Sequence, residues 1–179
     1  MADTNRSLAE LLILLADNTT GDISPQDIRD AVLSLTPAHG SMTVTTPGLT
    51  GVVTVNTPLK AAGVTGSTGT LHDYTMPLDN RLTFGGASPR ETQIACSLSL
   101  TTVGNNITVS IYLARNGVII PGSRMQQRIG TGADIQAIST SANFTLSDTD
   151  YIELWVENNT DATDITVEFM QMNVLGVLT

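Results

Sequence analysis

Hydrophobic residues recur along this chain with two different periods, and the first is helical. Between residues 7 and 16 leucines recur at the spacing of one face of an amphipathic helix. These leucines are Leu8, Leu11, Leu12 and Leu15. Ser7 and Glu10 have the spacing of a capping box, and residues 17–21 are typical of a turn. The pattern therefore predicts a first helix that ends before this turn.

A second helical pattern follows and has its own start and stop signals. Ser24 can act as N-cap, Pro25 suits the first turn, and Asp27 favours the positive end of the helix dipole. One face of this helix would carry Ile28, Ala31, Val32 and Leu35. Pro37 ends the pattern. Together the two patterns predict a hairpin of two short helices.

From Gly40 onward the period changes to two, and turn signals recur roughly every 8 to 12 residues. The clearest strand patterns cover 91–100, 106–115, 118–120, 135–146, 151–157 and 164–174, with shorter ones at 42–45, 52–56 and 71–77. Residues 61–70 favour a loop, and Asn116-Gly117 is a strong hairpin signal. With no helix between the strands, we expect an antiparallel jelly-roll sandwich. The chain would divide into a helical segment, 1–38, and a sandwich, 39–179.

Three large apolar residues lie on strand faces that the alternation assigns to the outside of the sandwich. They are Tyr112, Trp155 and Met170. Several large apolar groups that face outward indicate an interface, and the alternative is that a loop covers them.

The predicted helices are too short to be stable alone in water, so their apolar stripes need a partner. The partner is the chain's own sandwich, other copies of the helices, or another protein. We therefore predict that the helical segment is an anchoring or assembly element. Its candidate contact residues are Leu8, Leu11, Leu12, Leu15, Ile28, Val32 and Leu35.

Charge narrows the range of partners. The net charge is −9, and the eight basic residues, Lys60 and seven arginines, form no cluster. Nucleic acid and anionic membrane surfaces are therefore disfavoured as partners. The apolar run at 11–15 is too short to span a bilayer, and no signal-peptide cleavage site follows it, so we expect synthesis in a cytoplasm.

Candidate chemistry is sparse. The two histidines, His39 and His72, stand in no nucleophile or zinc motif, and the lone Cys96 reads as a buried hydrophobic residue. The paired aspartates near 148–150 and 161–164 lack the spacing of a calcium-binding loop. We predict no catalytic, cofactor-binding or metal-binding residues. A glycan-cleaving carboxylate pair is the weakest alternative, because sequence does not give the distance between carboxylates.

Several short motifs resemble a known family. Residues 97–174 contain YLARNG at 112–117, RIGTG at 128–132 and YIELWVEN at 151–158, followed by a polar turn and a VEF strand. This stretch resembles the trimeric jelly-roll domains of the tumour-necrosis-factor and complement type, most closely the version in tailed-bacteriophage virion proteins. Residues 15–35 are similar to a leader on phage head-fibre, decoration and tail-fibre proteins. The two resemblances cover most of the chain.

The resemblance implies a homotrimer in which one sheet face of each subunit packs around a three-fold axis. Tyr112, Trp155 and Met170 would then be interface candidates, and the helical leader would attach to the capsid or tail. The leading hypothesis is a non-enzymatic virion protein, a trimeric decoration (cement) or head-fibre protein made in the host bacterial cytoplasm. The alternative is a tail-fibre adhesin that binds a host-surface glycan or receptor, with an aromatic or acidic loop cluster, for example near Tyr74.

Overall fold

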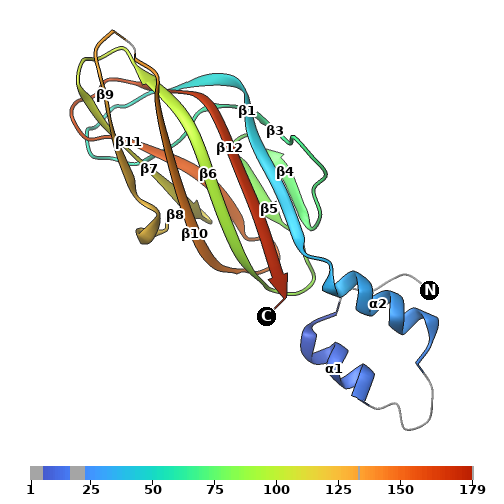
Figure 1. Cartoon of the computed structure of the whole chain (residues 1–179). Coiled ribbons are helices and arrows are strands. Elements are labelled where there is room, and N and C mark those ends of the chain that lie inside the picture. Colours follow the sequence, from blue (N-terminus) through green and yellow to red (C-terminus); the bar gives the residue numbers. More distant parts are fainter. Residues whose placement is uncertain (1–5, 17–22, 133, 179) are drawn as a thin grey trace.

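The computed structural model describes residues 6–16, 23–132 and 134–178 of the chain. Two helices precede two antiparallel sheets that pack face to face (Figure 1). The predicted fold class, a jelly-roll sandwich after a helical hairpin, is confirmed. The division of the chain at residues 38 and 39 stays a prediction, and the first strand begins at Ala38.

The two sheets contain all the described strands, and every pairing is antiparallel. Sheet A has the order β10 (Gln136–Leu146), β6 (Arg90–Thr102), β12 (Ile165–Leu178), β1 (Ala38–Thr50) and β3 (Gly63–Gly66). Sheet B has the order β4 (Tyr74–Leu78), β5 (Arg81–Phe84), β11 (Tyr151–Asn158), β7 (Ile107–Arg115) and β8 (Val118–Ile119). In sheet B, β2 (Leu59–Lys60) also pairs with β11, and β9 (Met125–Ile129) pairs with β7 after the short helix η1 (Pro121–Ser123).

The hydrophobic core lies between the two sheets and follows the predicted alternation. In sheet A the inward residues of β6 are Ile94, Cys96, Leu98 and Leu100. In sheet B the inward residues of β7 and β11 include Val109, Ile111, Leu113, Ile152, Leu154 and Val156. Burying each large aliphatic side chain contributes roughly 1.5–3 kcal/mol, so the core is the main source of the sandwich's stability.

A β-bulge in β12 reverses the expected alternation of that strand. The pairing register between β12 and β6 shifts between Val167 and Phe169. Because a bulge inserts one extra residue, each side chain that follows it changes face. Met170 therefore lies in the core with 1% of its surface exposed, and Phe169 faces outward with 51% exposed. The predicted outward position of Met170 is wrong.

Two predictions between residues 50 and 70 are also wrong. The segment 52–56 lies outside the strands, because other groups take its backbone hydrogen bonds. The Val52 N–H donates to Asp164 Oδ1 at 2.8 Å, and the Asn56 N–H donates to the Asn158 carbonyl at 2.9 Å. Asn56 also has a left-handed backbone (φ 58°), which breaks an extended strand. Conversely, the expected loop at 61–70 contains strand β3.

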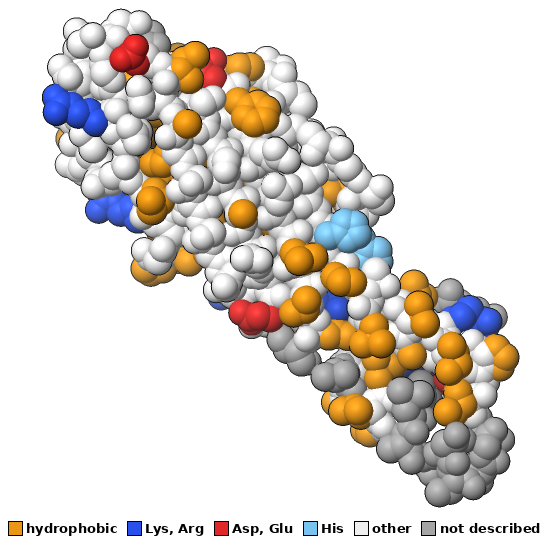
Figure 2. Space-filling model, in the orientation of Figure 1, with side chains coloured by type: hydrophobic (Ala, Val, Ile, Leu, Met, Phe, Trp, Pro, Cys, Tyr) orange, Lys and Arg blue, Asp and Glu red, His pale blue; other side chains and the backbone are white. Residues whose placement is uncertain are grey.

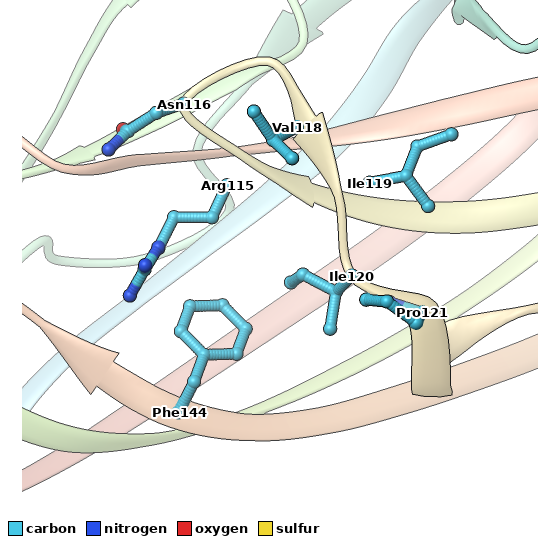
Figure 3. Close-up of a pocket in the computed structure, with 7 residues that line it drawn as sticks. All are labelled: Arg115, Asn116, Val118, Ile119, Ile120, Pro121 and Phe144. Atoms are coloured by element: carbon cyan, nitrogen blue, oxygen red, sulfur yellow. The ribbon is translucent and has the colours of Figure 1, made fainter.

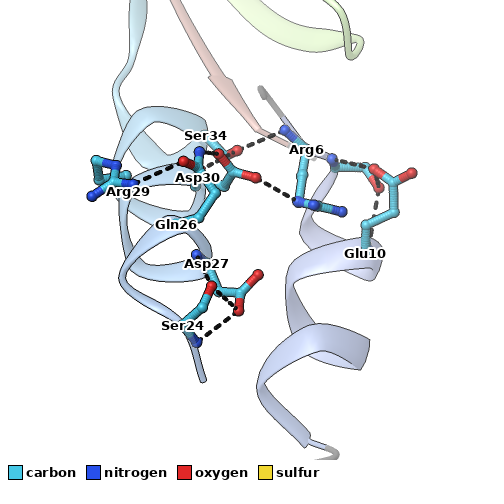
Figure 4. Close-up of polar contacts among 9 residues, drawn as sticks. Arg6, Glu10, Ser24, Gln26, Asp27, Arg29, Asp30 and Ser34 are labelled. Atoms are coloured by element: carbon cyan, nitrogen blue, oxygen red, sulfur yellow. Dashed lines mark hydrogen bonds and ion pairs between the residues drawn. The ribbon is translucent and has the colours of Figure 1, made fainter. Parts of the chain in front are cut away.

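Both predicted helices begin where their capping residues stand. Helix α1 spans Leu8–Ala16, and helix α2 spans Pro25–Leu35. Before α2, the Asp27 N–H donates to Ser24 Oγ at 3.2 Å, and the Ser24 N–H donates to Asp27 Oδ2 at 2.8 Å. Ser7 and Glu10 make the same reciprocal pair before α1. These capping boxes satisfy N–H groups that the helix itself leaves without partners (Figure 4).

Polar contacts join the two helices to each other and to the sandwich. Arg6 lies between the helices, with its Nε 3.2 Å from Asp30 Oδ2 and its backbone N–H donating to Ser34 Oγ (Figure 4). The buried Arg90 of β6 donates from Nη1 to the Ser34 carbonyl at 3.2 Å. The helices extend from one end of the sandwich and cover neither sheet (Figure 1).

Candidate interaction surfaces

Apolar side chains of both helices face solvent. We call this surface the helical face, and its exposed members are Leu12, Ile13, Ile28, Val32 and Leu35. Val32, at the centre of the α2 stripe, has 63% of its surface exposed. Of the other predicted anchoring residues, Leu11 is buried, and the side chains of Leu8 and Leu15 lie outside the described part of the structure.

Helix α2 is amphipathic in the opposite sense to an ordinary surface helix. Its buried residues are Asp30 and Ser34, whereas Ile28, Val32 and Leu35 are exposed. A surface helix normally turns its apolar stripe toward the protein core. Single exposed apolar residues are common, but a continuous stripe marks an interaction surface. The structure therefore leaves this stripe available to a partner.

A second surface is the outward side of strands β10, β6 and β12, which we call the sheet face. Its central positions are small or uncharged: Ala95, Ser97, Ser99, Ser139, Ser141, Gln171 and Asn173. Its larger apolar residues, each about half exposed, are Phe169, Leu175 and Val177. In Figure 2 this side of the sandwich carries scattered hydrophobic side chains, and charged groups lie at its margins. A surface without charges at its centre costs less to desolvate than a charged one.

Tyr112 and Trp155 lie side by side on the outward side of the other sheet. They are paired in register between β7 and β11. Tyr112 is nevertheless buried and donates its hydroxyl to Glu157, and Trp155 is half-buried. Their role in a trimer interface stays a prediction. The role expected for Met170 loses its basis, because this side chain is inside the core.

The same side of sheet B carries a buried charged cluster around Glu153. Its carboxylate accepts hydrogen bonds from Lys60 Nζ at 2.9 Å, Arg81 Nη2 at 2.8 Å and Trp155 Nε1 at 3.2 Å. Burial alone would raise the pKa of Glu153, but these hydrogen bonds outweigh it and hold the pKa below its ordinary value. Because each charge already has a partner inside the chain, the cluster is a structural feature of the subunit.

A pocket of about 440 Å³ opens at the edge between β8 and β10 (Figure 3). Its apolar lining consists of Val118, Ile119, Ile120, Pro121 and Phe144. At its rim, the Arg115 guanidinium lies 5.8 Å from the centre of the Phe144 ring and donates to the Thr145 carbonyl. The pocket can hold an apolar group beside a cation. It contains no pair of carboxylates and no histidine.

The described residues show no arrangement suited to catalysis or metal binding. No group of three or more His, Cys, Asp or Glu side chains among them is close enough to hold a metal. His39 and His72 stack on each other, with ring centres 5.6 Å apart. Burial raises the pKa of the Cys96 thiol to about 12, which makes it a poor nucleophile. No helix in the described ranges is long and apolar enough to cross a membrane.

Comparisons with known proteins identify the fold. No protein-family model and no curated protein matches the sequence. The structure of murine APRIL at pH 5.0 is similar, with a TM-score of 0.51 over 78% of this chain and 99% of that one, at 9% identity. The chain has a tumour-necrosis-factor-like fold. Identity this low shows the fold alone.

Two further structures resemble this tumour-necrosis-factor-like chain less strongly, each with a TM-score of 0.49. Eiger TNF from S. frugiperda is 7% identical, with 79% of this chain and 94% of that one covered. PRD1 vertex protein P5 is 9% identical, with coverages of 79% and 97%. The comparisons cover less than four-fifths of the chain.

The sheet face was not among the surfaces predicted from the sequence. After the bulge, Met170, Met172 and Val174 alternate with the polar Gln171 and Asn173. This alternation is the signal in the sequence that places Met170 inside. Once Met170 is inside, the same parity places Phe169, Leu175 and Val177 outside, on the sheet face.

Proposed function

We propose that this chain is a non-enzymatic structural protein of a phage particle, a homotrimeric capsid decoration (cement) or head-fibre protein that attaches through residues 1–38. The observation that supports this most directly is the helical face. Two capped helices extend from one end of the sandwich and expose apolar residues, Leu12 and Ile13 in α1 and the stripe of α2. This is the geometry expected of an attachment element.

Self-association would use the sheet face, which is flat, uncharged at its centre and flanked by exposed apolar residues. Three joined subunits would present three attachment segments, so each bound segment raises the effective concentration of the next. A trimer that bridges shell subunits would stabilise the assembled shell by mass action, because it binds only the assembled state. The mechanism therefore needs binding energy and no chemistry.

The alternative is an adhesin on a tail fibre, and one observation favours it. The pocket beside Phe144 offers an aromatic ring and the Arg115 cation, which suit the apolar face and an acidic group of a sugar. The expected aromatic cluster near Tyr74 is wrong, because Tyr74 is buried against Phe84. The two functions place the protein at different ends of a phage particle.

Immunogold labelling of phage particles from a culture that makes the chain would test the location. Gold on the heads is the expected result. Gold at the tail tips would favour the adhesin, and binding of the purified chain to a glycan array would support that outcome. If no particle were labelled while the chain was present in the culture, the virion role would be wrong.

We expect Phe169→Asp to weaken self-association by about tenfold or more, because it places a charge in the buried sheet face. Light scattering of the unchanged chain should give three times the 18.9 kDa mass of one chain. Val103→Asp is the matched control, since Val103 is exposed in the turn after β6, outside the sheet face.

Fluorescence of the single tryptophan, Trp155, would distinguish an interface at the sheet face from one at Trp155 and Tyr112. Trp155 lies on sheet B, so its emission maximum should stay constant when the trimer is diluted to monomers. An emission shift on dilution, together with an unchanged mass for Phe169→Asp, would place the interface at Trp155 and Tyr112 instead.

A further inference from the structure

Helix α2 is fixed to the sandwich, whereas α1 is attached through α2. Only two residues separate Leu35, the last residue of α2, from Ala38, the first residue of β1, whose side chain is fully buried. The Arg90 side chain, also fully buried, donates to the carbonyl of Ser34. By contrast, α1 contacts α2 through Arg6, which binds Asp30. The direction of the α2 stripe is therefore set by sheet A.

The helices expose hydrophobic side chains on the side of the molecule that carries the sheet face. Figure 1 shows sheet A with β6 and β12 toward the viewer, and Figure 2, in the same orientation, shows hydrophobic side chains gathered over the helices. Helix α2 contacts β12, and near the end of that strand Leu175 and Val177 are exposed on the sheet face. The apolar surface thus continues from the sheet face onto the helix.

We infer that α2 packs against α2 of a second copy of this chain, so that three copies form a helical collar at one end of the sandwich trimer. The contact residues are Ile28, Val32 and Leu35. The inference rests on the proposed function in one respect, namely that the sheet face is the interface between copies. Subunits that join through the sheet face bring their α2 stripes toward the same axis.

A second copy fits this surface better than a shell protein does. The short connection to β1 and the hydrogen bond from Arg90 prevent α2 from turning its stripe away from that axis. An isolated helix of 11 residues is marginal in water, and packing an apolar stripe against its copies supplies the missing burial. In this arrangement α1 is the helix that attaches to a shell, because its Leu12 and Ile13 side chains are exposed.

Pyrene attached to Val32→Cys in the full-length chain tests the collar. The only native cysteine, Cys96, has 1% of its surface exposed and a pKa of about 12, so it does not react with the maleimide. Excimer emission is expected where light scattering gives the trimer mass. Thr75→Cys is the matched control, because Thr75 is exposed on the outward side of sheet B and should give no excimer.

Val32→Asp provides a second readout without a label. Val32 is exposed in the single subunit, so the change leaves the subunit fold intact, and it is expected to weaken the trimer about tenfold or more. Trimer mass without excimer, and a normal dissociation constant for Val32→Asp, would overturn the collar while the proposed function stands. A monomer mass for the unchanged chain at its highest soluble concentration would overturn the proposed function and the collar with it.

Discussion

Asn80→Ala is expected to lower the free energy of unfolding by about 3 kcal/mol. Asn80 is buried in the turn between β4 and β5, and its Nδ2 donates to the carbonyls of Ala61 and Leu154 at 2.9 and 2.7 Å. Its Oδ1 accepts from the Leu154 N–H at 3.0 Å. Alanine would remove the partner of the Leu154 N–H and of the Ala61 carbonyl, and the Leu154 carbonyl would keep only its bond from the Ala61 N–H. It would also adopt the left-handed backbone (φ 49°) less readily than asparagine does.

Urea unfolding at a fixed protomer concentration would measure this loss, because association makes apparent stability depend on concentration. Asn105→Ala, at an exposed position after β6, is the matched control and should change stability by less than about 0.5 kcal/mol. Equal midpoints for the two variants would show that the hydrogen bonds of Asn80 contribute nothing to stability.

The second large effect is expected for Glu153→Gln, with a loss of about 3 kcal/mol at pH 7. The carboxylate has 2% of its surface exposed and accepts from Lys60, Arg81 and Trp155. Glutamine keeps the size of the side chain but removes the negative charge that balances the two cations. Asp148→Asn is the control, because Asp148 is exposed in the turn between β10 and β11, outside the sheet face.

The effect of Glu153→Gln should depend on pH with a definite sign. Burial opposes ionisation of Glu153, but its hydrogen bonds outweigh burial and place the pKa in the folded chain below the ordinary 4.5. A lowered pKa in the folded state stabilises the fold above the unfolded value, and this stabilisation is lost as the pH falls through the folded value. The difference between the two proteins should therefore be constant above about pH 5 and shrink in more acidic solution. A difference that grew on acidification would contradict this assignment.

Features set by neighbouring residues could be predicted from the sequence. The capping boxes at Ser7 and Ser24 depend on residues three positions away, and both are present. Asn116 and Gly117 both adopt the left-handed backbone, with φ of 54° and 73°, and join β7 to β8 as the hairpin signal predicts. The predicted alternation in β6 is also confirmed, because this strand pairs with β10 without a bulge.

Features set by distant residues could not be predicted. The position of the bulge near Glu168 depends on the pairing of β12 with β6, although the alternation that follows it already indicates that Met170 faces inward. The direction of the α2 stripe depends on Arg90, which is distant in sequence from Ser34. The helical pattern showed that a stripe exists. Which side of the molecule it faces depends on the short connection to β1 and on contacts with the sandwich such as the hydrogen bond from Arg90.

The pairing of β1 with β12 has a consequence for synthesis. These are the first and last strands of the described chain, and Ala38 lies opposite Gly176. Sheet A therefore cannot close until the ribosome has passed residue 176 and released that segment, and such long-range pairing is slow. A chain cut short by a premature stop codon lacks the middle strand of sheet A, and with it Phe169, Leu175 and Val177. Under the proposed assembly, chains that stop before β12 cannot join a trimer, so assembly excludes them.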